Sequence, residues 1–161
     1  MTHKIALILA AALAIPSGAA MGDVLRAEKT LTLDAAIDVA TAALARCRKD
    51  GYTVTVTVLD RSGRTKVVLH DDGATPHTIE NSLRKAYTSL TYREPSGAFG
   101  KRITASPTGA GVLHLDKVTA SEGGLPIVAG KEVVGAVGVS GAPGGDKDAV
   151  CGQAGIDRLA L

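Results

Sequence analysis

The side chains of this sequence best suited to ligate a metal are its histidines. Beyond the first twenty residues there are three, His70, His77 and His114, and none stands in a zinc-like spacing with another histidine or with a cysteine pair. A lone histidine can still ligate haem iron axially. His77 is the most accessible by pattern because it opens a predicted helix, although a histidine at a helix start is also an ordinary surface residue. The histidines therefore predict no structural zinc site, and they make His77 a candidate iron ligand.

Nucleophilic catalysis has little support in the sequence. Ser62, Ser140 and Cys151 lack the strand-to-helix turn that exposes a catalytic nucleophile, and nothing near them supplies a base and an orienting acid. Asp60 with Arg61 follows a predicted strand, where an aspartate commonly caps its own turn. No catalytic set is evident, and the sequence leaves open whether the chain is an enzyme.

Glycines gather toward the C-terminal end without forming a nucleotide-binding pattern. Neither the dinucleotide fingerprint nor the lysine and hydroxyl of a phosphate-binding loop accompanies them. A glycine in or beside a strand instead allows another backbone or a flat ligand to come close. This interpretation covers Gly135, Gly138, Gly141, Gly144 and Gly145.

The two cysteines, Cys47 late in a predicted first helix and Cys151 in a predicted last one, are either paired or two buried thiols. In an oxidising compartment they can pair if their Cα atoms lie within about 7 Å. A bridge over so long a loop contributes roughly 4 to 5 kcal/mol in the entropic model. The spacing alone does not decide between the two states.

The first twenty residues have the pattern of a secretory signal peptide. Lys4 precedes an apolar run over 5–15, which is too short for a membrane span of about 20 residues. Small residues then suit signal peptidase, either Gly18 with Ala20 or Ser17 with Ala19. We expect residues 1–20 to be a signal peptide, residues 21–161 to be one domain without membrane insertion, and the protein to be periplasmic or secreted. A retained N-terminal anchor is the alternative.

Composition narrows the partners of the remaining chain. Loss of Lys4 with the first twenty residues takes the formal net charge from +2 to +1, and no basic run marks a nucleic-acid surface. Nucleic-acid binding is therefore not expected. Only three tyrosines and one phenylalanine are present, so the core must be packed from small aliphatic side chains.

Hydrophobic periodicity predicts the elements of the first half of the chain. Apolar residues at helical spacing predict a helix over 31–50, and a strict alternation of threonine and valine predicts a strand over 53–59 with its valines buried. Turn residues at 60–63 and a second strand over 64–69 complete a hairpin. A second helix is predicted over 77–92.

The second half of the chain is predicted to repeat this alternation. A short helix is expected from Pro95 to Ile103, followed by a loop over 104–111 and an ambiguous stretch over 112–118. A second hairpin is expected from 125 to 140, and a last helix from Asp146. Hairpins interrupted by helices indicate an α+β fold, an antiparallel sheet flanked by helices.

Six short strings, read in order, give the sequence a family resemblance. They are Val58-Leu59-Asp60-Arg61-Ser62-Gly63, Asp72-Gly73-Ala74, Lys85-Ala86-Tyr87-Thr88, Gly123-Gly124-Leu125-Pro126-Ile127, the run from Val134 to Ala142, and Gly145-Asp146-Lys147-Asp148. With Leu31-Thr32 before them, they span nearly all of the chain beyond the signal peptide. In order and spacing the sequence resembles the GlcG/HbpS family, whose members include haem-binding and haem-degrading proteins.

The resemblance implies a roughly five-stranded antiparallel sheet flanked by helices, a homo-oligomer, and haem or iron binding among exported members. Thr88 matches the position that the family suggests as a contact to haem iron, with Lys85 and Tyr87 beside it. The chain departs from the family at His70, where an arginine commonly stands. His70 therefore either offers iron a nitrogen or weakens a contact to an anion.

A haem site needs an aliphatic slot, an iron ligand and a cation at its rim. On this basis Thr88 or His77 would reach the iron, and Arg84 or Lys85 would pair with a propionate. The glycine-rich strands would let the disc approach.

Three functions follow as hypotheses. The leading one is an exported haem carrier, store or redox-sensing accessory. The second is an enzyme of the same fold, which either degrades haem with a reductant or acts on a small organic acid or corrinoid. The third is a regulatory partner of a membrane sensor protein.

Overall fold

The computed structural model describes residues 24–106 and 108–161, so the expected signal peptide at 1–20 lies outside the described residues. The helices alternate with two strand pairs, as the sequence predicts. In chain order the elements are α1 (Leu33–Lys49), β1 (Thr55–Asp60), β2 (Thr65–His70), α2 (His77–Tyr92), α3 (Ser96–Thr104), the 3₁₀ helix η1 (Gly109–His114), β3 (Gly124–Ala129), β4 (Glu132–Ser140) and α4 (Gly145–Ile156).

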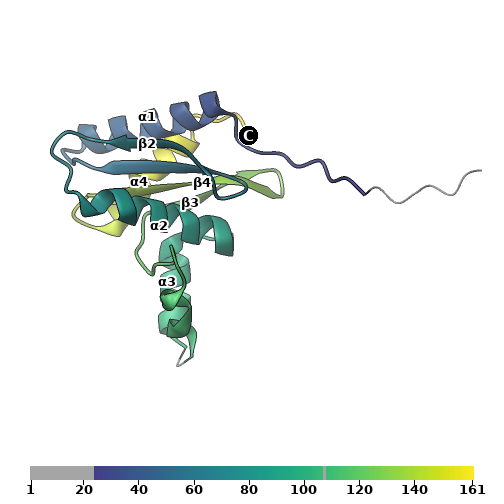
Figure 1. Cartoon of the computed structure of the whole chain (residues 1–161). Coiled ribbons are helices and arrows are strands. Elements are labelled where there is room, and N and C mark those ends of the chain that lie inside the picture. Colours follow the sequence, from purple (N-terminus) through teal and green to yellow (C-terminus); the bar gives the residue numbers. More distant parts are fainter. Residues whose placement is uncertain (1–23, 107) are drawn as a thin grey trace, which may run out of the picture.

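The strands form one antiparallel sheet in the order β2-β1-β4-β3. Helices α1 and α4 cover one face, α2 covers the other, and α3 extends from the α2 side away from the sheet (Figure 1). The expected α+β fold is confirmed. The described residues form four strands, where the resemblance implied about five, and the segment before β3 contains η1 and irregular chain.

The larger core lies between the sheet and the pair α1 and α4. Val56 and Val58 of β1 point into it beside Val137 and Val139 of β4, and all four are fully buried. Helix α1 begins where Thr32 accepts a hydrogen bond from the amide of Ala35, as an N-cap does. The alternation of β1 thus buries its valines as predicted.

The opposite face of β1 is polar and equally buried. Thr55 and Thr57 are fully covered by α2, where Thr57 shares a hydrogen bond of 2.7 Å with Ser82. This packing is close because β4 carries a glycine beneath the helix: a Cβ added at Gly138 would overlap the backbone of Ser82 and Ala86. The close approach expected at Gly138 is therefore that of a helix backbone and not of a flat ligand.

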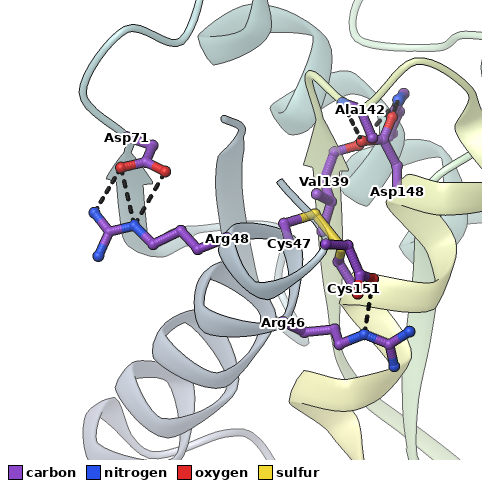
Figure 2. Close-up of a disulfide and its surroundings, with 10 residues drawn as sticks. Arg46, Cys47, Arg48, Asp71, Val139, Ala142, Asp148 and Cys151 are labelled. Carbon is purple, nitrogen blue, oxygen red and sulfur yellow. Dashed lines mark hydrogen bonds and ion pairs between the residues drawn. A yellow bond between two sulfur atoms is a disulfide. The ribbon is translucent and has the colours of Figure 1, made fainter. Parts of the chain in front are cut away.

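The two cysteines are joined. Cys47 of α1 and Cys151 of α4 form a disulfide with a Cα–Cα distance of 5.4 Å, and Figure 2 shows it crossing between the two helices. Of the two alternatives left by the sequence, the structure supports the paired one. The bond ties the first helix to the last across 104 residues.

The α3 arm has a small core of its own. Phe99, Ile103 and Val118 are buried together, and the ring of Phe99 stacks on that of Tyr92. Within the described residues, no helix is both long and apolar enough to cross a membrane.

Candidate functional site

Five of the six predicted site residues lie on α2, and the helix separates them. His77 opens the helix and Thr88 lies eleven residues later, a rise of about 16 Å at 1.5 Å per residue. One iron atom cannot contact both side chains. The two predicted iron contacts are therefore alternatives, and each must be judged by its surroundings.

Thr88 is fully buried against the segment that follows η1. Its hydroxyl oxygen accepts a hydrogen bond of 2.9 Å from the backbone N–H of Thr119. A ligand could reach this oxygen only if the 118–121 segment moved and that N–H found another acceptor.

Lys85 is buried and already paired. Its ammonium donates to Asp148 Oδ2 at 2.7 Å and to the carbonyl oxygen of Val139 at 2.9 Å. The other oxygen of Asp148 accepts from the N–H of Ala142 at 3.0 Å, a contact drawn in Figure 2. Burial raises the pKa of the Asp148 carboxyl, although Lys85 and the Ala142 amide act in the opposite direction.

This pairing decides what Lys85 can do. If it turned toward a propionate, Asp148 would be left as an unpaired buried charge, at a cost of about 3 to 5 kcal/mol. Lys85 therefore serves the fold by joining α2 to β4 and to the first turn of α4. Its polar surroundings include a pocket of ≈ 400 Å³ that it shares with His77, Asn81, Ser140 and Glu122.

Arg84 and Tyr87 occupy other flanks of α2. Arg84 donates to the carbonyl of Val118 at 2.7 Å, while its Nε is buried without a partner in the described residues. It shares a hollow on the outer face of α2 with His77. The Tyr87 ring is half-buried, with the ammonium of Lys117 5.6 Å from its centroid.

His70, the sixth predicted residue, ends β2 with its ring exposed and its orientation fixed. The hydroxyl of Thr78 donates to the carbonyl of Thr75 at 2.6 Å, so the hydroxyl of Thr55, 2.6 Å from Thr78 Oγ1, must donate to Thr78. His70 Nδ1, 2.7 Å from Thr55 Oγ1, must then be the donor in its own hydrogen bond. In the neutral ring Nε2 carries the free lone pair.

This is the arrangement found at metal-binding histidines. Such a histidine usually donates its second ring N–H to a fixed acceptor, which sets both the tautomer and the ring plane. No group of three or more histidine, cysteine or carboxylate side chains that could hold a bare metal ion occurs among the described residues. A single oriented imidazole suits an iron whose other ligands come from a porphyrin.

An open apolar surface adjoins His70. Opposite residues of β1 and β2 share a face, so Val68 and His70 lie on the face that α2 covers over β1. Because α2 packs over β1, β4 and β3, the β2 edge of this face stays open, and Val68 is 43% exposed. Helical spacing places Ile79, Leu83 and Tyr87 on the flank of α2 toward β2, since Tyr87 lies against Gly63 of the β1–β2 turn.

We call this surface the β2 shelf and define it by Lys66, Val68 and His70 of β2 with Ile79, Leu83 and Tyr87 of α2. It offers apolar side chains, an imidazole with a free Nε2 and a lysine. A haem requires the same three kinds of group. The donor set of the shelf fits haem better than the buried surroundings of Thr88 and Lys85 do.

The shelf was only partly visible in the sequence. The sequence identifies His70 and Tyr87 as candidates, but nothing in it distinguishes Val68 or Ile79 from other strand and helix residues. The hydrogen-bonded chain from His70 through Thr55 to Thr78 leaves almost no pattern in the sequence. Its one signal is that Thr55 lies on the face of the strand opposite to the buried valines. Asp148 stood in a family string, but a partner 63 residues away cannot be inferred from spacing.

Comparison with known proteins now places the fold in a family. The family model described as "Haem degrading protein HbpS-like" matches residues 31–157. The chain belongs to this family. The GlcG/HbpS resemblance is thereby confirmed, and the protein GlcG of Escherichia coli K12 is 28% identical over 93 residues, which are 58% of this chain and 68% of GlcG.

Solved structures agree with this assignment. A double mutant of HbpS from Streptomyces reticuli is 36% identical, with a TM-score of 0.80 over 92% of this chain and 99% of HbpS. The structure of PduOC in complex with haem has a TM-score of 0.75 over 81% of this chain and 96% of PduOC. Its identity is 20%, so that likeness shows a shared fold.

Proposed function

We propose that this member of the HbpS-like family is an exported haem-binding protein that acts as a carrier, store or redox-sensing accessory. Membership in a family described by haem degradation supports haem as the ligand, and PduOC, a protein of the same fold, has been solved with haem. The observation in this chain that carries the proposal is the exposed imidazole of His70, whose Nδ1 is held by Thr55.

Haem would lie on the β2 shelf. His70 Nε2 would ligate the iron, Val68 and Ile79 would contact the porphyrin face, and Lys66 would pair with a propionate. The bound haem would supply an iron centre able to change oxidation state. The chain's part is to orient the ligand through Thr55 and to keep one face of the ring against apolar side chains.

Export and assembly complete the proposal. A disulfide persists in an oxidising compartment, which agrees with the signal-peptide pattern at 1–20 and supports a periplasmic or secreted protein. The shelf is open on its outer side, so a second copy of the chain is the proposed cover for the exposed haem face. In a homo-oligomer, the second copy would shield the iron from the water that reaches it on a single chain.

The test is a titration of the purified, disulfide-bonded protein with haemin, followed by absorbance and by size-exclusion chromatography. We expect saturable binding with a shifted Soret band. We expect His70→Ala to lose that band position and to weaken binding at least tenfold, because iron loses its protein ligand. His77→Ala is the matched control, a second exposed histidine away from the shelf, and is expected to bind as wild type does.

Other outcomes have definite meanings. Loss of the Soret shift in Thr88→Val, with His70→Ala unchanged, would move the iron to the buried face of α2. Non-saturating absorbance in the wild type would refute haem as the ligand. A further arm with an added reductant separates storage from turnover, since progressive bleaching of bound haem would indicate degradation.

A further inference from the structure

A basic pocket lies at the end of the sheet remote from His70. The segment before α1, the β1–β2 turn, the end of α2 and the β3–β4 turn meet there around a volume of ≈ 290 Å³. His70 pairs with Thr55, the first residue of β1, whereas Arg61 follows the last, so about 20 Å along the strand separates the two positions. The pocket is therefore separate from the proposed iron ligand, although Tyr87 of the shelf lies against Gly63 of the same turn.

Cations dominate the lining of this pocket. Arg26, Arg61, Arg93 and Lys131 all contribute to it, and Glu132 is its only carboxylate among the described residues. Leu90 and Val133 supply an apolar wall. Glu28 also pairs with Arg26 and Arg61, so four cations face two carboxylates. The remaining charge of +2 matches that of a dianion.

Arg61 is the fixed member of the set. Its Nη1 bonds Glu132 Oε2 at 2.7 Å, and its side chain is only 18% exposed. Asp60 closes the turn by accepting from the N–H groups of Ser62 and Arg64 at 2.8 and 3.0 Å. A guanidinium held in this way presents its remaining donors without further ordering.

Arg93 is held in an unusual backbone conformation. It ends α2 in the left-handed region, with φ 58° and ψ 31°, where glycine is the usual residue. Helix termination therefore does not explain an arginine here, and the cost of this conformation is consistent with a role for the side chain. Among the described residues, neither Arg93 nor Lys131 has an ion-pair partner.

The local field is positive as well. The pKa of Glu132 is lowered mainly by its hydrogen bond to Arg61, and Lys29 and Arg26 lower it further. Glu132 thus stays ionised as the anchor of Arg61. The two cations without partners are the groups left to bind an anion.

We propose that this basic pocket binds a small organic dianion, either a phosphate ester or a dicarboxylate. Arg93 would receive the anionic oxygens in the forked geometry that a guanidinium group offers both kinds of anion. Arg61, whose Nη1 and Nε face Glu132 and Glu28, would add its remaining donors. Lys131 would add a point charge, and Leu90 with Val133 would contact the carbon part of the ligand. The volume suits a small molecule and not a macromolecular surface.

Isothermal titration calorimetry of the oxidised protein tests this, with inorganic phosphate and succinate as probes at constant ionic strength in sodium chloride. We expect saturable binding of at least one probe, and the preferred one identifies the ligand class. Arg93→Gly combined with Lys131→Gln should weaken binding about 10- to 100-fold, since each change removes a charged donor. Glycine suits the left-handed position, so the melting temperature should not fall through Arg93→Gly.

The control variant is Arg64→Gln, which removes an exposed cation from the same hairpin outside the pocket. It should bind the probes as wild type does. The proposal is overturned if neither probe saturates, if the double variant binds normally, or if Arg64→Gln weakens binding as much as the double variant does.

Discussion

Asp71 shows how a single carboxylate fixes the neighbourhood of His70. It is 5% exposed, and both of its carboxylate oxygens accept hydrogen bonds from Arg48, whose Nε lies 3.1 Å from each (Figure 2). The hydrogen bond from Arg48 is the main reason that the pKa of Asp71 lies below its ordinary value. The pair ties the end of α1 to the chain that leaves β2.

This pair predicts part of the acid sensitivity of the protein. A carboxyl whose pKa is lower in the folded state stabilises the fold above its unfolded pKa of about 4, and this stabilisation is lost as pH falls through the lower, folded value. Asp71→Asn should therefore lower the free energy of unfolding at pH 7, and its difference from wild type should shrink toward pH 3. Urea unfolding across this pH range measures the difference.

Asp72→Asn serves as the neighbouring control. Asp72 is exposed and has no ion pair among the described residues, so the change should alter stability little at any pH. If the Asp71 variant differed from wild type by the same amount at pH 3 and pH 7, its effect would not come from ionisation.

The buried polar residues of α2 show where sequence reasoning is weakest at this scale. A lysine, a serine and a threonine on a helix normally indicate a solvent face, yet Lys85, Ser82 and Thr88 are all buried. Each is satisfied by a partner far along the chain, and such pairings leave no local pattern. The sequence identifies both His70 and His77 as candidates, but only the hydrogen bond between His70 and Thr55 distinguishes the two.

At the scale of elements, α2 packs on β4 with its backbone close to the strand. Gly138 leaves no room for a side chain, because an added Cβ would overlap backbone atoms of both Ser82 and Ala86. Backbone atoms within a packed helix cannot move aside as the end of a flexible side chain can. The position of α2, and with it the height of the shelf above β2, depends on this glycine.

Gly138→Ala should consequently destabilise the protein by about 1 to 3 kcal/mol, the usual cost of overpacking. Chemical denaturation gives this value. Gly111→Ala is the matched control, since nothing lies within 4 Å of its added Cβ, and it should leave stability nearly unchanged. Equal effects of the two substitutions would mean that α2 can shift at little cost.

Periodicity predicted most elements well because their apolar stripes are regular. The strand over 53–59 and the helices over 31–50 and 77–92 correspond to β1, α1 and α2. The ambiguous stretch over 112–118 and the loop before it contain η1, which is too short to leave a periodic signal. The burial of the threonine face of β1 could not be predicted either. Alternation identifies the apolar face of a strand but does not indicate what covers the polar face.

At the scale of the whole molecule, the proposed iron ligand and the basic pocket lie at opposite ends of β1. His70 pairs with the first residue of β1, and the basic pocket adjoins the end of that strand. Both depend on loops and edges, whereas the core between α1, α4 and the sheet is closed. The disulfide between Cys47 and Cys151 joins α1 to α4 in that core. It therefore stabilises the sheet that carries both sites.

The disulfide is therefore expected to contribute strongly to the global stability of the protein. Its sequence separation of 104 residues corresponds to about 4.7 kcal/mol in the entropic model, a large share of the 5 to 15 kcal/mol typical of a domain. Reduction of the wild type, or replacement of both cysteines by alanine, should shift the denaturant midpoint sharply downward. The double variant should then be insensitive to reductant, which separates the bond from other effects of reducing conditions. A wild type with two titratable thiols, and with a midpoint that a reductant leaves unchanged, would show instead that packing alone holds α1 against α4.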